Sequence, residues 1–416
     1  MVLSVIRKKL KMKHYKKLAI GVLILLMIVG ATGVSASAPD AGSAQGQSAL
    51  APLLVVPGWE QVNSNGFGDP NAGEVSALEV FNSYIYAGTN NPITPGPDLD
   101  GARIFRSANG TTWAPVTDPG FGNAHDTAPT AVLDMVVFGS YIYASTGRSA
   151  NAAKIFRSLT GASGTWAPVV NTGFSNPDNH DIPALAVYNG KIYAGVTNTE
   201  TGVQIWSSFN GGGSINDWDP VPPTETGPAP SSLTGLAVFD GALYGAVQSE
   251  GPIQIWNTYS TDWAPVNSDG LGDANNTTAG GMAVFGGYLY VGVGNTTSGA
   301  KLYRTNDAAT WNPVTVTGLN GAGNQKVEAV FVFQNQLYVS AYNATTGIQL
   351  WRSPDGTLWE RANQDGFGDS HNPGTNGSNA SANFQGLLYM GTSNVTDGGE
   401  LWRTQPQRVY APLLRR

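Results

Sequence analysis

The chain has 416 residues, of which 12% are charged, and it contains 53 glycines, 25 prolines and 10% aromatic residues. This composition excludes an intrinsically disordered chain and argues against a helical one. The absence of cysteine excludes disulfides, thiolate metal sites and cysteine nucleophiles. The net charge is −7, and seven of the 22 basic residues lie within the first 17 positions, so the remaining chain is strongly acidic. An acidic body argues against nucleic acid and anionic membranes as partners.

The N-terminal segment has the pattern of an export signal. Residues 1–17 are basic, residues 18–34 form an apolar run, and small residues follow. This order predicts a signal peptide over 1–36 and a linker over 37–57, and therefore a secreted or cell-surface protein. The alternative is an uncleaved anchor, through which alone the chain would contact a membrane, because the apolar run is near the lower length limit for a span.

Seven tryptophans recur in one sequence context at spacings of 45 to 54 residues: Trp59, Trp113, Trp166, Trp218, Trp263, Trp311 and Trp359. After each tryptophan come a glycine-rich loop, an apolar run that ends in an aromatic residue, a tight turn and a run that contains a tyrosine. A further loop and a third run ending in an aromatic residue complete the unit. Dipeptides such as Asn189-Gly190 in the tight turns are hairpin signals. We name the four predicted strands of a unit a, b, c and d, with the tryptophan in strand d.

Four short strands in a repeat of about 50 residues are typical of a propeller blade. The sequence therefore predicts an all-β fold, a seven-bladed β-propeller of four-stranded blades over residues 58–404, followed by a tail over 405–416. The last strand c, at Leu401-Trp402-Arg403, has no tryptophan-bearing strand after it. We expect the strand around Trp59 to complete the last blade and so to join the two ends of the propeller.

Two turns between strands c and d carry a family resemblance. The segments Ser107-Ala108-Asn109-Gly110-Thr111-Thr112-Trp113 and Ser353-Pro354-Asp355-Gly356-Thr357-Leu358-Trp359 resemble the Asp-box of sialidase-type propellers, with a loop one residue shorter. The whole repeat also resembles secreted bacterial repeat propellers. This resemblance implies a fold and not an activity, since the box is a structural hairpin in that superfamily. The sialidase F/Y-R-I-P motif is absent from this sequence.

The long d–a and b–c loops are expected on one face of the propeller, which makes that face the default binding surface. Five d–a loops place an acid or amide at the same repeat position: Asp69, Asn123, Asn176, Asp273 and Asp369. Their oxygen atoms suit a Ca²⁺ ion. The competing interpretation is that each side chain caps its own turn by accepting backbone hydrogen bonds.

The same loops contain three histidines, His125, His180 and His371. Histidine titrates near neutral pH and ligates metals, so a metal or acid–base site is one hypothesis. The other is that these loops simply favour Asn, His and Asp. Arg148 replaces an asparagine that begins most b–c loops and is a distinctive cation on the expected binding face.

Two acids interrupt the small-residue positions of strand a, namely Glu79 and Asp134. An acid near a propeller channel has a raised pKa when it is buried, which suits a general acid or base. A pair of acids from adjacent repeats is the requirement of glycoside chemistry. The alternative is that a wet channel merely solvates them.

The first-ranked interpretation is an exported binding module that recognises a glycan or a surface protein through the d–a and b–c loops, and the sequence favours this module over an enzyme without deciding between them. The alternatives are a polysaccharide-acting hydrolase or lyase that uses Glu79 or Asp134, and a structural cell-surface protein without a ligand. No metal site and no cofactor are expected, with Ca²⁺ the one weak possibility. The protein is expected to be a monomer and not to bind nucleic acid.

Overall fold

The computed structural model describes residues 58–91, 101–123, 128–147, 152–198, 200–222, 232–248, 250–258, 262–321 and 323–405. These residues belong to one compact unit that begins at Leu54. The predicted signal peptide and linker, and the tail from residue 406 onward, lie outside the described residues. Within the described ranges, no helix has the length and apolar character needed to cross a membrane.

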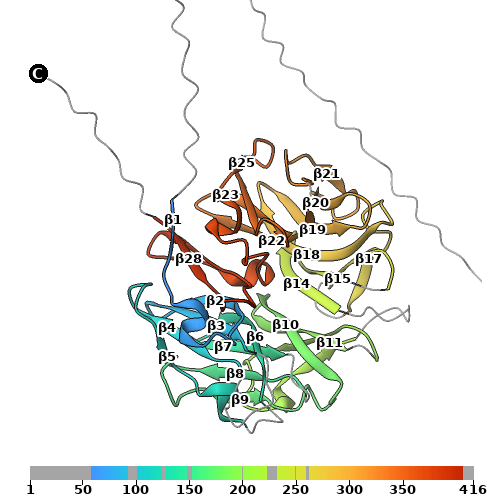
Figure 1. Cartoon of the computed structure of the whole chain (residues 1–416). Helices are drawn as coiled ribbons and strands as arrows, with labels where there is room; N and C mark the ends of the chain where they lie inside the picture. Colours follow the sequence, from blue (N-terminus) through green and yellow to red (C-terminus); the bar gives the residue numbers. More distant parts are fainter. Residues whose placement is uncertain are drawn as a thin grey trace, which may run out of the picture. The chain divides into compact units, whose positions relative to one another are not determined.

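The described strands fall into sets of four that follow one another around a common centre (Figure 1). The a strands are β2 (Glu74–Phe81), β6 (Ala131–Phe138), β10 (Asn179–Tyr188), β14 (Ser232–Phe239), β18 (Asn276–Phe285), β22 (Asn324–Phe333) and β26 (Ser381–Phe384). The b strands are β3 (Tyr84–Asn90), β7 (Tyr141–Gly147), β11 (Lys191–Asn198), β15 (Ala242–Gln248), β19 (Tyr288–Asn295), β23 (Gln336–Asn343) and β27 (Leu387–Gly391).

The outer strands are shorter. The c strands are β4 (Ile104–Ser107), β8 (Ile155–Ser158), β12 (Gln204–Ser208), β16 (Gln254–Thr258), β20 (Gly299–Thr305), β24 (Gln349–Ser353) and β28 (Leu401–Thr404). The d strands are β5 (Ala114–Pro115), β9 (Ala167–Val170), β13 (Asp219–Val221), β17 (Ala264–Asn267), β21 (Asn312–Val314), β25 (Glu360–Arg361) and β1 (Trp59–Gln61). The described helices are short 3₁₀ turns: η1 (Asn65–Gly68), η2 (Pro119–Gly122), η4 (Ile215–Asp217), η5 (Asp365–Gly368) and η6 (Gly377–Ala380).

Every a strand ends at the aromatic residue that the sequence pattern indicated. Most d strands differ from expectation, because they begin one residue after their tryptophan, as β5 does after Trp113. The tryptophan ring packs against aromatic neighbours instead; Trp113, for example, meets Phe67 edge-on at 5.5 Å between ring centroids. We refer to the sets as first to seventh in chain order of their a strands, and β1 belongs to the seventh.

Hydrogen-bonded pairing runs a–b–c–d within each set and is antiparallel throughout. The a strands of the first six sets each contact the next one along the chain, which stacks these sets side by side, and the a strand of the sixth set contacts η6 of the seventh. In the seventh set, β1 pairs with β28 in the register Trp59–Thr404, Glu60–Arg403 and Gln61–Trp402. A strand from the beginning of the described chain therefore completes the sheet formed at its end, and β2 also contacts β26.

The glycine-rich d–a loop has a repeated strained conformation. In η1, Gly66 and Phe67 both have positive φ angles, 58° and 57°. A left-handed backbone conformation is energetically unfavourable for phenylalanine, so surrounding contacts must stabilise it. Phe67 stacks on Phe105 with 4.3 Å between ring centroids. The same stacking joins Phe121 to Phe156 in the next set. Each of these two loops is therefore held against strand c of the set into which it leads.

The periodic arginines of strand c have structural contacts. Arg106, Arg157 and Arg304 lie over the rings of Tyr84, Tyr141 and Tyr288, with 4.4 to 4.6 Å from guanidinium carbon to ring centroid. Arg403 bonds instead to Glu60 and to the hydroxyl of Tyr389. These contacts account for the arginine repeat without a ligand.

The centre of the a strands is filled by the segment that includes η6. The Asn376 side-chain amide donates to the carbonyl oxygens of Ser76 (2.9 Å) and Leu133 (3.3 Å). The Asn379 amide donates to the carbonyl oxygens of Leu133 (3.2 Å) and Pro183 (3.0 Å). The repeat pattern predicts a wet channel at this centre. The seventh d–a loop instead turns inward and bonds to backbone groups of the first three sets.

Neighbouring sets also contact each other where the hydroxyl group of a b-strand tyrosine lies against a glycine in the c–d turn of the adjacent set. A Cβ on Gly110 would overlap the hydroxyl oxygen of Tyr389, so the first and seventh sets are in contact there. The same relation joins Gly161 to Tyr86 and Gly356 to Tyr290.

This contact yields a test with a matched control. Gly110 and Gly190 have nearly equal φ angles, +73° and +74°, but a Cβ on Gly190 would meet nothing within 4 Å. Gly190→Ala should destabilise the protein by about 1 kcal/mol through backbone strain alone. Gly110→Ala should cost about 1–3 kcal/mol more because of overpacking. Urea unfolding curves of both variants measure the difference, and equal losses would contradict the contact between the first and seventh sets.

Candidate functional site

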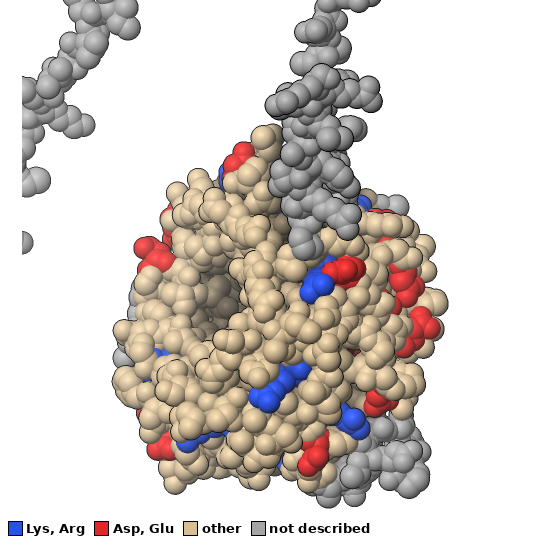
Figure 2. Space-filling view, turned by 90° about the vertical axis from the view of Figure 1, so that its left-hand side faces the viewer, with Lys and Arg blue, Asp and Glu red and all other residues tan. Residues whose placement is uncertain are grey.

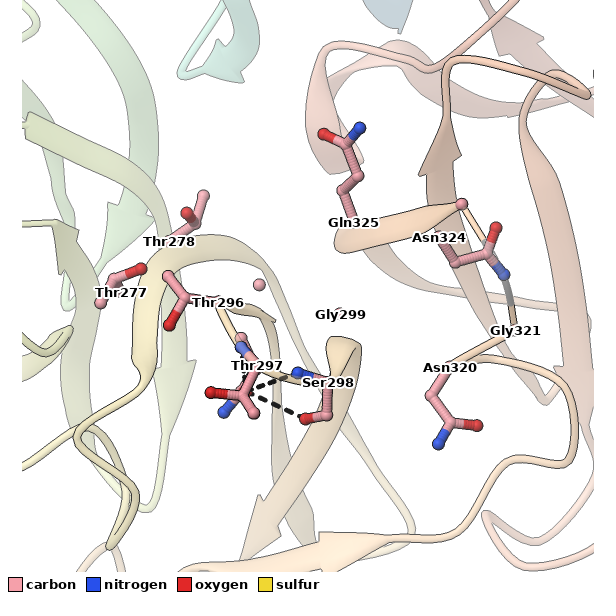
Figure 3. A pocket seen from close by; sticks show the side chains of 13 residues that line it. Thr277, Thr278, Thr296, Thr297, Ser298, Gly299, Asn320, Gly321, Asn324 and Gln325 are labelled. Carbon is pink, nitrogen blue, oxygen red and sulfur yellow. Dashed lines mark hydrogen bonds between the residues drawn. The ribbon is translucent and has the colours of Figure 1, made fainter.

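A polar cleft lies between the fifth and sixth strand sets, where a b–c loop faces a d–a loop (Figure 3). Its volume is about 560 Å³, which is within the range of small-molecule sites. One wall is Gly294–Gly299, and the opposite wall includes Asn320 and Gln325. The remaining lining residues are Thr277, Thr278, Gly321, Gly323 and Asn324. Hydroxyl, amide and backbone groups therefore surround the cleft, and no charged or aromatic side chain lines it. We call this feature the polar cleft.

Buried amides fix both walls of the polar cleft. Asn295 accepts hydrogen bonds from the backbone nitrogens of Thr297 (3.0 Å) and Ser298 (2.9 Å), which shapes the b–c loop. Its own amide donates to Asn276 and Asp273 in the d–a loop of the same set. Because the Asn295 side chain is buried and makes all four bonds, the loop geometry is set before any ligand arrives.

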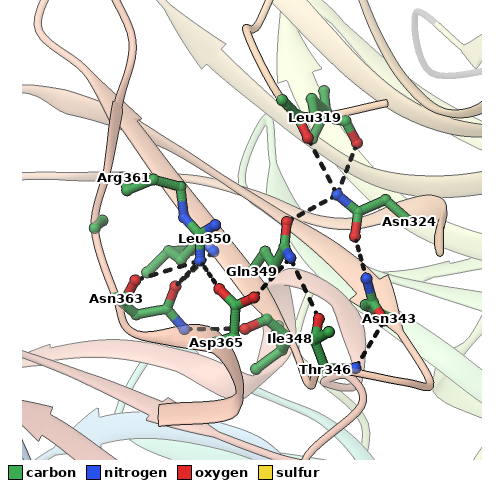
Figure 4. Close-up of polar contacts among 12 residues, drawn as sticks. Leu319, Asn324, Asn343, Thr346, Ile348, Gln349, Leu350, Arg361, Asn363 and Asp365 are labelled. Atoms are coloured by element: carbon green, nitrogen blue, oxygen red, sulfur yellow. Dashed lines mark hydrogen bonds and ion pairs between the residues drawn. The ribbon is translucent and has the colours of Figure 1, made fainter. Parts of the chain in front are cut away.

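The opposite wall is fixed in the same way (Figure 4). The Asn324 amide donates to the carbonyl oxygen of Leu319 (3.0 Å) and to Gln349 (2.9 Å), and Asn343 donates to Asn324 (2.8 Å). Gln349 continues the network to Asp365, which also pairs with Arg361. These links tie the sixth d–a loop to the following loops of the chain.

The five predicted acid and amide positions of the d–a loops mostly cap turns. Asp69, Asp273 and Asp369 each accept the backbone nitrogen two residues on, and Asn176 does the same. Asn123 donates to the carbonyl oxygen of Gly120. Asp69, Asp273 and Asp369 also accept an amide from the asparagine that opens the b–c loop. The five residues therefore do not converge on one ion; each belongs to its own set.

Two of the three predicted histidines lie among the described residues, His180 in the third set and His371 in the seventh. His371 bonds through Nδ1 to Asp397 Oδ2 at 2.7 Å, and its Nδ1 lies 3.7 Å from Asp369 Oδ1. The hydrogen bond to Asp397 is the main cause that raises the pKa of His371. His180 lies half-buried at the start of β10. His125 and Arg148 lie outside the described residues. Asp397 was not singled out from the sequence, although its repeat position carries serine or threonine in the third, fifth and sixth sets.

The two predicted catalytic acids are bound to backbone groups. Asp134 Oδ1 accepts the nitrogen of Met135 (2.8 Å), and Oδ2 accepts that of Leu185 in the third set (2.7 Å). Burial raises the pKa of Asp134 to about 8. Glu79 accepts the nitrogen of Val80, and burial raises its pKa to about 7. Neither acid is among the described residues that line the polar cleft, the cavity beside Glu328 or the pocket beside Phe67.

A third acid lines a small cavity beside the central segment. Glu328 accepts the backbone nitrogen of Thr375 (2.8 Å) and pairs with Lys326 at 3.3 Å. Burial raises its pKa to about 7. The cavity has a volume of about 170 Å³ and is also lined by Asn376 and Asn379. This volume is smaller than that of the sites that usually hold sugars or drug-sized ligands.

The surface has few charges around its hollow. Figure 2 shows one face of the molecule with a hollow bordered by uncharged residues, while the acidic and basic side chains lie farther out. Another pocket of about 520 Å³ lies beside Phe67 and Trp113 and is bordered by Arg103. Phe67 and Trp113 pack against each other there, which explains their position without a ligand.

Comparison with protein families and with curated proteins finds no match to this chain. Solved structures do match. An ancestral GH74 enzyme is 16% identical, with a TM-score of 0.52, and the match covers 82% of this chain and 47% of that one. The chain thus spans about half the length of that enzyme. This likeness shows an all-β fold of the propeller type.

Two other structures are less similar in shape. A protein of unknown function from Dyadobacter fermentans is 12% identical, with a TM-score of 0.47 and coverage of 84% of this chain and 100% of that one. A mutant of Trypanosoma rangeli sialidase that displays trans-sialidase activity is 12% identical, with a TM-score of 0.44 and coverage of 83% and 57%.

The raised pKa of Asp134 predicts a pH-dependent stability. Unfolded aspartate titrates near pH 4, so between about pH 4 and pH 8 the folded chain holds a proton that the unfolded chain releases. The stabilisation from this group is full below pH 4 and is lost as pH rises through 8. The difference in melting temperature between wild type and Asp134→Asn should therefore shrink across this window.

Asp355 supplies the control for that measurement. Backbone hydrogen bonds from Leu358 and Thr357 lower its pKa to about 2. Asp355→Asn should therefore leave the pH slope between 4 and 8 unchanged. Parallel melting curves for wild type and Asp134→Asn over this range would contradict the buried, proton-holding state of Asp134.

Proposed function

We propose that this chain recognises a neutral glycan in the polar cleft. The observation that carries the proposal is a cleft of about 560 Å³ lined only by hydroxyl, amide and backbone groups. Sugar hydroxyls both donate and accept hydrogen bonds, and threonine, serine, asparagine and glutamine side chains do the same. A lining without charge favours an uncharged sugar over an acidic one, because a buried anion needs a cationic partner.

We further propose that the chain forms a closed, seven-bladed propeller whose c–d turns are Asp-box hairpins. Support comes from the pairing of β1 with β28 and from the contact between Gly110 and Tyr389. In the sixth set, Asp355 Oδ1 accepts the nitrogens of Thr357 and Leu358, both at 2.8 Å. Closure completes the seventh sheet and leaves only short, protected outer edges, which favours a soluble monomer. The basic and apolar segment over residues 1–36 supports export.

A second candidate function is a glycan-acting enzyme. The structural likeness to an ancestral GH74 enzyme favours this alternative over a binding module. The acids Glu79, Asp134 and Glu328, with pKa values near 7 or 8, supply groups able to hold a proton at neutral pH. Against it, the polar cleft contains no acid, so catalysis would require a substrate to reach a different part of the molecule.

The binding proposal predicts a graded loss of affinity in the polar cleft. Asn320→Ala should weaken binding about 3- to 10-fold, the value of one lost hydrogen bond, and Asn320→Ala with Gln325→Ala should weaken it further. Asn312→Ala is the matched control, since Asn312 is an exposed asparagine on β21, outside the cleft lining. A neutral glycan array followed by titration of the best ligand measures these values. Equal losses at Asn312 and Asn320 would place the glycan elsewhere.

The enzyme candidate is tested on the same glycan panel by release of reducing ends. Glu79→Gln, Asp134→Asn and Glu328→Gln are each expected to abolish turnover if their acid takes part, while the folded state is checked by circular dichroism. Binding without release supports the recognition proposal. Release that disappears in one of these variants supports the enzyme, and no binding with no release removes both glycan functions.

A further inference from the structure

Three metal-ligating side chains meet in the loops of the seventh strand set. Asp369 follows η5, His371 lies two residues later, and Asp397 lies in the loop between β27 and β28. One ligand atom from each residue lies within 4.8 Å of the other two. All three side chains reach solvent, so an ion could enter directly.

The distances fit a small ion. His371 Nδ1 is 2.7 Å from Asp397 Oδ2 and 3.7 Å from Asp369 Oδ1. Two ligands of a tetrahedral zinc ion, each bound at about 2.0–2.1 Å, lie roughly 3.4 Å apart. The two observed separations bracket this value, and the ligand atoms of all three residues lie within 4.8 Å of one another, so side-chain adjustments would seat an ion in place of the proton between Nδ1 and Oδ2.

The charge at this place differs from that in the other repeats. In the fifth set, Lys301 Nζ lies 2.8 Å from Asp273 Oδ2 and neutralises it. The residue at the Lys301 position of the seventh set is Glu400, which is 4% exposed. Where the fifth set has a lysine, the seventh set therefore has a third carboxyl group beside Asp369 and Asp397. Among the described residues, no lysine or arginine forms an ion pair with these three acids.

The ligand positions also depart from the repeat. The fifth set has Asn275 and Ser298 where the seventh has His371 and Asp397. Both positions hold a metal ligand in the seventh set and a neutral group in the fifth, although the second set also has a histidine, His125, at the position of His371. The combination of His371, Asp397 and Glu400 occurs in the seventh set alone among the seven repeats.

Surrounding bonds hold the ligands in position. Asn394 donates to Asp369 Oδ2 (3.3 Å) and accepts from the backbone nitrogen of Asp397 (2.9 Å), so one asparagine orients both acids. Glu400 accepts from Trp402 Nε1 (2.8 Å). Such outer contacts typically tune the affinity of a metal site.

We propose that Asp369, His371 and Asp397 bind one divalent transition-metal ion of the zinc class, with Glu400 adding negative charge beside the ligands. A histidine nitrogen among oxygen ligands favours zinc or its neighbours over calcium, which prefers oxygen alone. The ion joins the seventh d–a loop to the seventh b–c loop. This proposal is independent of the glycan proposal, because none of these residues lines the polar cleft.

The test is a zinc titration of the purified, chelator-treated protein, read by isothermal calorimetry and by metal analysis after gel filtration. We expect one zinc ion per chain in the wild type. His371→Asn and Asp397→Ser should remove this binding, and each introduces the residue that the fifth set carries there. His180→Asn is the matched control and should leave the binding unchanged.

The substitution Glu400→Gln tests the negative charge of Glu400 separately from the hydrogen bond that Glu400 accepts from Trp402. Gln204 and Gln254 occupy the Glu400 position in the third and fourth sets and accept the equivalent tryptophan bond. Glu400→Gln therefore keeps that bond, removes one negative charge and should weaken zinc about 10- to 100-fold. Unchanged affinity in Glu400→Gln would contradict the charge argument.

The metal-binding residues of the seventh set can also be introduced into the fifth set. This variant tests the proposal even if substitutions in the seventh set prevent folding. Asn275→His, Ser298→Asp and Lys301→Glu, together with the native Asp273, rebuild all four side chains of the seventh-set group. We expect two zinc ions per chain in this triple variant. Absence of zinc from the wild type, or equal binding by wild type, His371→Asn and Asp397→Ser, would overturn the proposal.

Discussion

The fold depends on satisfying the backbone groups where the a strands converge. Carbonyl groups of Ser76, Leu133 and Pro183 point to a region that other strands cannot reach, and buried carbonyls need donors. The amides of Asn376 and Asn379 supply them. One loop of the last set therefore holds backbone groups of the first three sets. The sets around it are then free to differ in their outer loops, since their inner ends are fixed.

Repetition and departure from repetition have different meanings in this chain. The repeated acids and amides of the d–a loops cap turns, and the repeated arginines lie over tyrosines, so these residues hold each set together. Chemistry is expected where a position breaks the pattern without a structural need. Glu400 in place of a cation, next to Asp397 and His371, is such a place. Asp134 also breaks the pattern, but its hydrogen bond to Leu185 gives it a structural role between two sets.

The sequence allowed the strand ends and the order of strands to be predicted because tyrosines, tryptophans and turn glycines recur at fixed offsets. The candidate site was harder to predict. The polar cleft combines Thr296 with Asn320, residues of two different repeats whose types are common in loops. A signal was present in the asparagines Asn295 and Asn324, whose buried amides shape the two walls. Only their burial separates them from ordinary loop asparagines.

The amino-acid sequence by itself determined the all-β class and the four-strand repeat, because these depend on patterns of residues close in sequence. The tertiary structure decided which side chains from distant segments meet. It placed η6 among the a strands, brought Asp397 to His371, and opened a cleft between the fifth and sixth sets. Such encounters depend on how neighbouring sets stack, and stacking geometry is not encoded in the spacing of any single repeat.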